Sequence, residues 1–174
     1  MLPSRYSYSI YSSFLTPEEV EEVRDMIPPF EEWNLTNLMS SKEYVNRALL
    51  DRQKYSSVYS LLNTYLSRVG LMISPSSHIS PRLYQVGSFM DWHVDFGETD
   101  LDKEKKDVYE CVVTLGNTSD IRTYFKDKDT GKITSHASNA GDLIILCRHG
   151  ISHSVSKCTT GERLILKLTC VDRI

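Results

Sequence analysis

The segment His93-Val94-Asp95 holds two side chains that bind metals, an imidazole and a carboxylate, separated by one apolar residue. In an extended strand, residues i and i+2 point to the same face, so His93 and Asp95 would lie side by side. Such a pair fills two adjacent positions on one metal ion. His-x-Asp also occurs often by chance, so the triplet predicts a site only if a third ligand comes from elsewhere in the chain.

Two histidines near the end of the chain are candidates for that third ligand. His149 and His153 both follow the apolar run of residues 142–147. Two imidazoles and one carboxylate on one side of a metal form the facial triad of non-haem Fe(II) oxygenases, which leaves positions open for substrate and oxygen. His93, Asp95 and one of these histidines therefore predict an iron site.

An arginine in the last apolar run adds a second kind of chemistry. Leu164, Leu166, Leu168 and Cys170 would face one way in a strand, whereas Arg163 and Ile165 would face the other. A guanidinium turned into a closed interior is costly unless an anion meets it. A carboxylate is its best partner, because the two groups form paired hydrogen bonds. Arg163 therefore predicts an anionic ligand.

Composition limits the function classes. The chain of 174 residues fits one domain, and its net charge of −3 lacks the basic character of nucleic-acid-binding proteins. No apolar run reaches the roughly 20 residues of a membrane helix, and the N-terminus lacks the apolar core of a signal peptide. We expect an intracellular, cytoplasmic protein of a single domain, residues 1–174, with no membrane segment. Its cysteines form no C-x-x-C pair: Cys111, Cys147, Cys158 and Cys170. Three of them lie in apolar stretches and are expected to be buried reduced thiols.

The chain divides into a helical first part, about residues 16–70, and a strand-rich second part, about residues 80–172. One helix should begin at Thr16, where Glu19 completes a capping box, and another runs from Ser56 to a stop at Gly70. Residues 31–55 give no clear pattern. Strands are expected at residues 6–15, 82–87, 89–95, 108–115, 121–126, 132–136, 142–147, 151–157 and 163–171. This order predicts an α+β fold with helices packed outside a β core.

These elements together resemble the 2-oxoglutarate- and Fe(II)-dependent dioxygenases, in particular their prolyl-hydroxylase-like branch. The resemblance covers roughly residues 14–27 and 82–171. It rests on H-x-D at residues 93–95, on H-x-V at residues 153–155 and on G-x-R at residues 161–163. It rests also on Tyr-x-x-Gly at residues 84–87 and on the opening helix FLTPEEVEEV. The family spacing selects His153 over His149, because only His153 is followed by the Val and the Gly-x-Arg pair.

The resemblance implies a double-stranded β-helix (jelly roll) core. It implies that His93, Asp95 and His153 hold Fe(II) and that Arg163, with Tyr84, binds 2-oxoglutarate. The resemblance also implies ascorbate as an optional reductant. The implied reaction is hydroxylation of a C–H bond with O2, releasing succinate and CO2. Residues 97–107 follow the two ligands directly and would form either a solvated loop or a lid over the substrate.

The substrate is less well specified. A peptidyl side chain or a small molecule is favoured, although Thr118–Thr123 departs from the turn that many prolyl hydroxylases carry. AlkB-like demethylation of nucleic acid is the alternative, but Thr169 stands where that family has a second arginine. A catalytically inactive β-helix that only binds a ligand is a third reading.

Other side chains near these motifs have simpler roles in the sequence reading. Arg82 lies on the same strand face as Tyr84 and could meet either ligand or solvent. Trp92 and Phe96 point away from the metal face and are expected in the core. His78 and His136 lie in polar segments and are expected at the surface.

Overall fold

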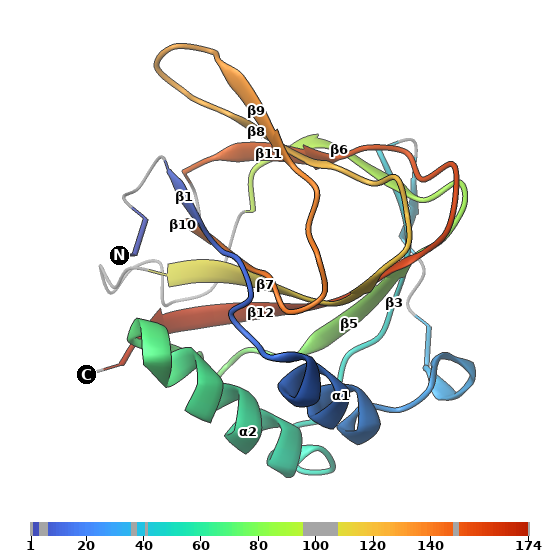
Figure 1. Cartoon of the computed structure of the whole chain (residues 1–174), viewed down its shortest axis with the longest axis vertical. Helices are drawn as coiled ribbons and strands as arrows, with labels where there is room; N and C mark the ends of the chain where they lie inside the picture. The colour runs from blue at the N-terminus through green and yellow to red at the C-terminus, as the bar shows by residue number, and fades with distance from the viewer. Residues whose placement is uncertain are drawn as a thin grey trace.

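Two antiparallel sheets form the body of the protein (Figure 1). The structure is a computed structural model and describes residues 2–3, 7–35, 38–40, 42–95, 108–147 and 150–173. Strand β3 belongs to both sheets, so the strands follow one another in the order β1-β10-β7-β12-β5-β3-β6-β11-β8-β9. This is the double-stranded β-helix core with helices outside that the sequence predicts.

The larger sheet runs from β1 to β3, with β4 paired to β12. Its strands are β1 (Tyr8–Tyr11), β10 (Leu143–Cys147), β7 (Val108–Asn117), β12 (Arg163–Asp172), β4 (Leu71–Ile73), β5 (Ser80–Tyr84) and β3 (Glu43–Arg47). The smaller sheet continues from β3 and also carries β2 (Leu38–Ser40). Its other strands are β6 (Phe89–His93), β11 (Ser152–Val155), β8 (Thr123–Lys126) and β9 (Ile133–His136).

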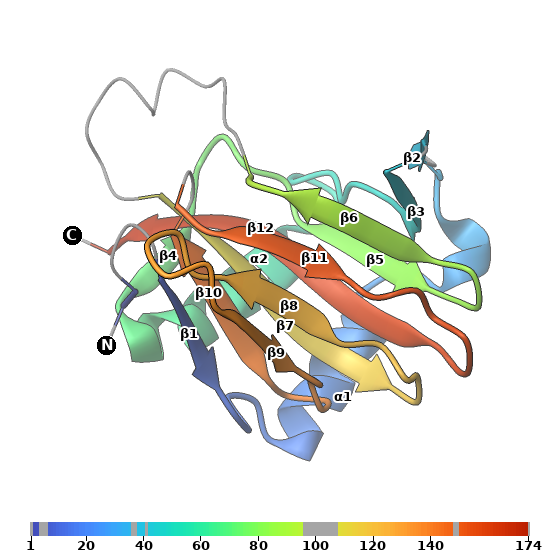
Figure 2. The same ribbon diagram turned by 90° about the horizontal axis from the view of Figure 1, so that it is seen from above.

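Two helices cover the outer face of the larger sheet (Figure 2). Helix α1 (Pro17–Met26) begins at the predicted capping box, in which Thr16 and Glu19 bond each other's backbone N–H groups. Helix α2 (Ser56–Leu66) passes into a 3-10 turn, η2 (Ser67–Val69), which ends at Gly70 with a φ of +77°. A further 3-10 turn, η1 (Phe30–Glu32), follows α1.

Alternate residues of the long strand β12 face two different interiors. Leu166, Leu168 and Cys170 are fully buried against the helices, in the core that also contains Val23 and Leu62. Burying an aliphatic side chain of this kind contributes about 2 kcal/mol, so this layer holds the helices firmly on the sheet. The residues between them point into the space enclosed by the two sheets, where the polar groups gather.

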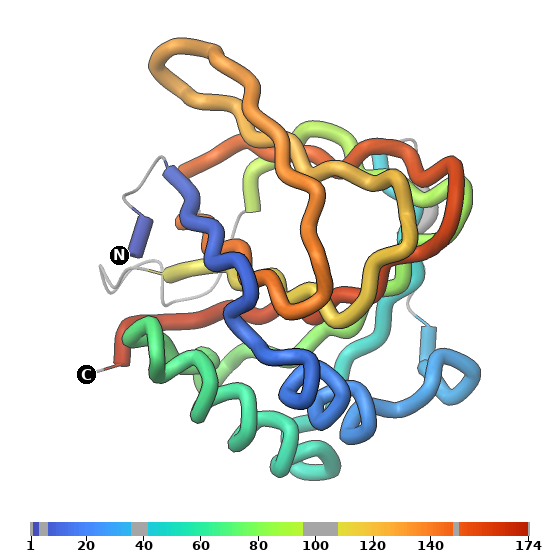
Figure 3. The backbone as a smooth tube through the Cα atoms, viewed as in Figure 1, coloured from blue at the N-terminus to red at the C-terminus, as the bar shows by residue number. Residues whose placement is uncertain are grey.

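Strand β1 meets the far edge of the smaller sheet. Its Tyr8 ring stacks on Phe125 of β8 with centroids 3.9 Å apart, and its hydroxyl bonds Thr134 of β9 over 2.7 Å. Beyond this contact the β8–β9 hairpin projects away from the two sheets (Figure 3). These contacts close the side of the β-helix opposite β3.

Most predicted elements are present, with different bounds. The strand expected at residues 6–15 is limited to Tyr8–Tyr11, because the chain turns at Ser13, whose φ is +54°, before α1. Residues 31–55, which had no clear pattern, contain β2 and the shared strand β3. All four cysteines are buried free thiols, whereas burial was expected for three of them. None of the helices in the described ranges is long and apolar enough to span a membrane.

Candidate active site

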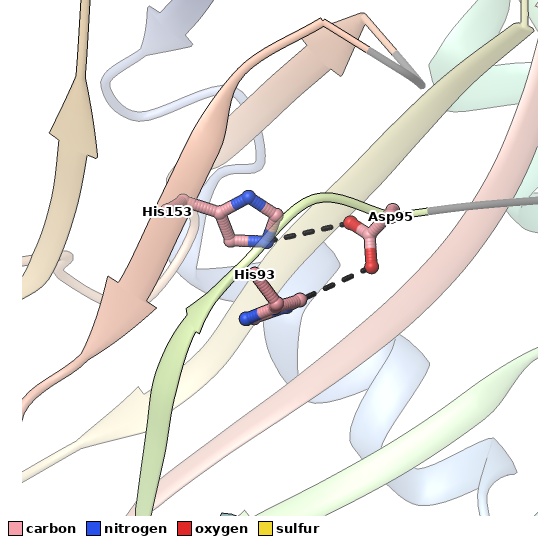
Figure 4. Close-up of side chains that lie close together, drawn as sticks. All are labelled: His93, Asp95 and His153. Carbon is pink, nitrogen blue, oxygen red and sulfur yellow. Dashed lines mark ion pairs between the residues drawn. The ribbon is translucent and has the colours of Figure 1, made fainter. Parts of the chain in front are cut away.

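His93 and His153 face each other across a strand pair of the smaller sheet. They are register partners in the antiparallel β6–β11 ladder, and their rings lie 4.2 Å apart between centroids. Asp95 lies two residues beyond His93. Ligand atoms of the three side chains all lie within 4.8 Å of one another, and Figure 4 shows both imidazoles turned toward the Asp95 carboxylate. The structure therefore brings together the three residues that the sequence singled out.

The hydrogen bonds of the two imidazoles decide which nitrogen of each ring is available. Nδ1 of His93 lies 2.7 Å from the carbonyl oxygen of Asp91, and Nδ1 of His153 lies 3.2 Å from that of Ile151. A carbonyl oxygen only accepts, so each Nδ1 carries the proton and donates. In a neutral ring Nε2 then holds a lone pair. Metal-binding histidines commonly have this outer hydrogen bond.

Both Nε2 atoms point at a carboxylate. The distance from Nε2 of His153 to Oδ2 of Asp95 is 3.3 Å, and that from Nε2 of His93 to Oδ1 is 3.8 Å. Oδ2 of Asp95 is buried and has no hydrogen-bond partner. Three electron-pair donors thus converge on one point, and a cation between them would satisfy all three. Two nitrogens and one carboxylate oxygen fit a divalent iron ion.

The charge states of the cluster also suit a metal. Burial alone raises the pKa of Asp95, but the charge of Lys167 and the neighbouring imidazoles outweigh it and hold that pKa well below its usual range. Burial lowers the pKa of His153 to about 4, with Asp95 opposing the shift and His93 adding to it. At neutral pH the site therefore presents an ionised carboxylate and an uncharged imidazole, the forms that bind metals.

Lys167 is the direct hydrogen-bond partner of Asp95. Its Nζ lies 2.6 Å from Oδ1 of Asp95 and 3.8 Å from the buried Glu110. Glu110 is held in turn by the hydroxyl of Thr169, 3.0 Å away. Thr169 stands where the AlkB-like family has a second arginine, and here its hydroxyl donates to the Glu110 carboxylate. Lys167 therefore fixes Oδ1 of Asp95 and leaves Oδ2 facing His153.

Arg163 lies in the same pocket as the three-residue cluster. Its side chain is 2 % exposed, and its guanidinium donates to Thr123 over 3.1 Å and to Ser138 over 3.4 Å. Nε has no partner. Burial lowers the pKa of Arg163, an effect opposed by Tyr84 and Asp142. A buried guanidinium bonded only to two neutral hydroxyls has unused donors for an anion.

Tyr84 reaches this pocket from the adjacent strand. It is 2 % exposed, it lines the pocket and it is the register partner of Arg163 in the β5–β12 pair. The family resemblance implies that these two side chains bind one ligand, and they do lie side by side. Arg82, two residues earlier, is 8 % exposed and lines the same pocket, so it faces the pocket and not the solvent.

The turn before Arg163 requires a glycine. Gly161 has a φ of +66°, and a Cβ there would lie 2.3 Å from the carbonyl oxygen of Thr118. The same turn is tied to the β7–β8 connection because the backbone N–H groups of Thr159 and Thr160 donate to the carboxylate of Asp120. The Gly-x-Arg spacing therefore sets where β12 begins and which way Arg163 points.

Two expectations for neighbouring residues were wrong. Trp92 points away from the metal face, but it is 40 % exposed and not part of the core, because the helices cover only the larger sheet. His136 is half-buried at the end of β9, where its Nε2 lies 3.2 Å from the buried carboxylate of Asp142. His78 is exposed, as expected. His149, Phe96 and the expected lid at residues 97–107 lie outside the described residues.

Sequence reasoning missed several side chains that line this pocket or bond to residues that do. Lys167 could have been found, since it continues the alternation of Arg163 and Ile165 by one more step. Thr123, Ser138 and Glu110 gave no signal, because their contacts join segments that are far apart in the sequence.

Sequence comparison alone gives no relative for this chain. No protein-family model matches it, and no curated protein matches it. Comparison of the fold is more informative. A prolyl-4-hydroxylase from Pseudomonas putida superimposes with a TM-score of 0.70 at 17 % identity, over 97 % of this chain and 94 % of that chain.

Two further solved structures have the same fold. A Trichoplax adhaerens prolyl hydroxylase, solved with a hypoxia inducible factor peptide, gives a TM-score of 0.68 at 13 % identity, over 95 % of this chain and 83 % of that chain. HygX from Streptomyces hygroscopicus, solved with nickel and 2-oxoglutarate, gives a TM-score of 0.68 at 14 % identity, over 97 % of this chain and 84 % of that chain. The chain thus has the fold seen in 2-oxoglutarate oxygenase structures.

Proposed function

We propose that this protein, as one domain spanning residues 1–174, is a Fe(II)- and 2-oxoglutarate-dependent dioxygenase. It hydroxylates a C–H bond of a peptidyl side chain or a small molecule and releases succinate and CO2. The observation that carries the proposal is the shared pocket. One cavity is lined by the His93, Asp95 and His153 donors and by the buried guanidinium of Arg163, which lies on β12. 2-Oxoglutarate is a dianion with a group for each end of this cavity. Its keto acid end chelates a metal held by the three donors, and its distal carboxylate pairs with Arg163.

His93, Asp95 and His153 are the proposed iron ligands, through the two Nε2 atoms and the unpartnered Oδ2. The backbone carbonyls that accept from Nδ1 keep both rings in the ligating tautomer. Lys167 holds the remaining oxygen of Asp95. When bound, the iron and 2-oxoglutarate supply oxidative decarboxylation of the cosubstrate coupled to hydroxylation of the substrate.

Arg163 is the proposed partner of the distal carboxylate of 2-oxoglutarate. Thr123 and Ser138 orient its guanidinium without neutralising it, and Tyr84 stands beside it. An anion there removes the cost of a buried unpaired cation, so cosubstrate binding is favoured by the fold itself. Ile165 and Val155, both buried, line the pocket between this end and the metal ligands and exclude water from it.

The similar structures support this assignment in two ways. HygX was solved with nickel and 2-oxoglutarate, and two of the others are prolyl hydroxylases. They also support peptides and small molecules as substrate classes, since one was solved with a peptide and another structure of HygX contains hygromycin B.

Turnover of 2-oxoglutarate tests the proposal. With Fe(II), O2 and ascorbate as reductant, the protein should form succinate, and His153→Ala should lower the rate by at least about a hundredfold. His78→Ala is the matched control, because His78 is an exposed histidine outside the pocket. Equal rates in the two variants would contradict the iron assignment.

The same assay, run with a substrate panel, separates the reaction classes. Peptides and small molecules that are hydroxylated gain one oxygen atom, which mass spectrometry detects. Methylated oligonucleotides that are demethylated release formaldehyde. Formaldehyde release without any oxygenated peptide or small molecule would contradict the proposed hydroxylation and support demethylation of nucleic acid.

A further inference from the structure

Arg82 is a cation in the pocket that neither iron nor 2-oxoglutarate requires. It lies on β5, two residues before Tyr84 and opposite Ile165 of β12, and it lines the pocket together with His93 and Asp95. Only 8 % of the residue is exposed. A side chain this polar is almost never buried without a partner.

The guanidinium of Arg82 has no such partner in the part of the chain that the structure describes. Its Nε is buried without a hydrogen bond, and none of the described carboxylates forms an ion pair with the group. Leaving buried donors unsatisfied costs free energy, more so when they belong to a charged group. A protein retains such a group where a ligand supplies the missing acceptor.

Arg47 adds a second positive charge beside Arg82. It is the register partner of Arg82 in the β3–β5 pair, so the two side chains leave neighbouring strands on the same face. Its Nε is also buried without a hydrogen bond. Burial and the charge of Arg82 both lower the pKa of Arg47, and Glu43 opposes them. Like charges placed directly opposite each other destabilise a sheet, which an anion bound between them would reverse.

The charges of the proposed complex point to the origin of that anion. Divalent iron, the Asp95 carboxylate, doubly charged 2-oxoglutarate and Arg163 together are neutral. Lys167 and Glu110 form a second neutral pair. Arg82 is left over, and Glu43 is the acidic group that acts on Arg47. The unmatched positive charge therefore fits a group that arrives with the substrate.

We propose that Arg82, supported by Arg47, binds a carboxylate of the substrate, so that the protein oxidises a carbon close to an acid group. The inference rests on the proposed function for the identity of the reaction. A carboxylate bound in a pocket that also contains His93 and Asp95 holds its neighbouring carbons near the metal ligands. The carboxylate can belong to a free acid, such as an amino acid, or to an acidic side chain of a peptide.

Paired probes test this assignment. The anaerobic complex of protein, Fe(II) and 2-oxoglutarate is titrated with free amino acids and with the corresponding amino acid amides, and then with Asp-containing peptides and their Asn counterparts. Binding is read from the perturbation of the visible iron–keto-acid band. We expect the acids to bind at least about tenfold more tightly than the amides. Whether amino acids or peptides respond identifies the source of the carboxylate.

Three variants accompany the titration. Arg82→Gln should remove the preference for acids over amides, whereas Arg173→Gln, at an exposed arginine outside the pocket, should keep it. Arg82→Met should leave the Tm of the metal-free protein unchanged or raise it, since it replaces an unpaired buried charge by an apolar side chain. A purely structural arginine would show the opposite, a fall in Tm.

The outcomes separate the inference from the function on which it rests. If wild-type protein forms no band with Fe(II) and 2-oxoglutarate, the proposed function fails, and calorimetry of the same acids and amides with metal-free protein still tests Arg82. If Arg82→Gln itself loses the band, Arg82 belongs to the cosubstrate and the inference is overturned. It is overturned too if amides bind as well as acids, or if no acid binds.

Discussion

His153 lies directly opposite His93 in the antiparallel β6–β11 ladder, so the backbone pairing of two strands sets the distance between the imidazoles. The two residues are 60 positions apart in the sequence, and no loop has to bring them together. Asp95 then follows His93 by two residues and completes the cluster. Sites held on strands keep their geometry better than sites held on loops.

Lys167 should tune the affinity of the site for iron. Lys167→Met removes the 2.6 Å bond to Oδ1 of Asp95 and frees the carboxylate to rotate. We expect Fe(II) to bind about tenfold more weakly, the lower end of the effect of removing an outer partner of a metal ligand. Competition with a chromogenic chelator measures the affinity. Lys157→Met, at an exposed lysine, is the control, and equal affinities in the two variants would remove Lys167 from the site.

Thr123 should affect the cosubstrate and not the metal. Thr123→Val deletes the hydroxyl that accepts from Arg163 over 3.1 Å, so the guanidinium loses its orientation. The KM for 2-oxoglutarate should rise about tenfold, in line with the loss of one hydrogen bond to a charged group. Thr134→Val removes a hydroxyl bonded to Tyr8, away from the pocket, and should leave KM unchanged. A change in iron affinity alone would contradict the orienting role.

Much of this site could be predicted from spacing. His93 and Asp95, and likewise Arg163 and Ile165, follow the two-residue period of strands, which a sequence displays directly. The same period would have reached Lys167. Arg47 could not be found in this way, because residues 31–55 show no clear period and because its partner Arg82 is set by the β3–β5 pairing.

The error at Trp92 has a related cause. Alternation predicts which residues share a face, but not which face is covered. Strand β6 belongs to the smaller sheet, whereas α1 and α2 both pack on the larger one (Figure 1). The side of β6 that carries Trp92 is therefore exposed to solvent. Helices could be predicted from the sequence, but the sheet that they cover could not.

Gly161 should be replaceable only at a high cost. In Gly161→Ala the new Cβ would lie 2.3 Å from the Thr118 carbonyl in a left-handed conformation. We expect a loss of about 3 kcal/mol in the free energy of unfolding, from the left-handed backbone together with overpacking. Gly131→Ala is a matched control, since Gly131 has a φ of +69° but nothing within 4 Å of a Cβ. It should lose only about 1 kcal/mol.

Urea denaturation of the two glycine variants gives these free energies. Gly161→Ala should also weaken 2-oxoglutarate binding, because the turn sets where Arg163 points. Equal stability of the two variants would show that the turn relaxes around the methyl group. In that case the close approach of Gly161 to Thr118 would not be what positions Arg163.

Arg163 should bind the cosubstrate while contributing little to metal affinity. Arg163→Met fills a similar volume without the charge, so the fold should be retained. We expect 2-oxoglutarate turnover to fall by at least about a hundredfold, the loss of a buried charge-assisted pair, with Fe(II) affinity unchanged. Parallel measurements of turnover and of iron binding test this. An equal loss of both would make Arg163 a structural residue.

The central claim is that His93, Asp95, His153 and Arg163 together hold Fe(II) and 2-oxoglutarate in one pocket. The most direct measurement is the visible absorption spectrum of the anaerobic protein as both are added. The account predicts a charge-transfer band of the iron-chelated keto acid that is present in wild type and in His78→Ala and absent in His153→Ala. A folded wild-type protein without the band, or a band that persists in His153→Ala, would contradict it.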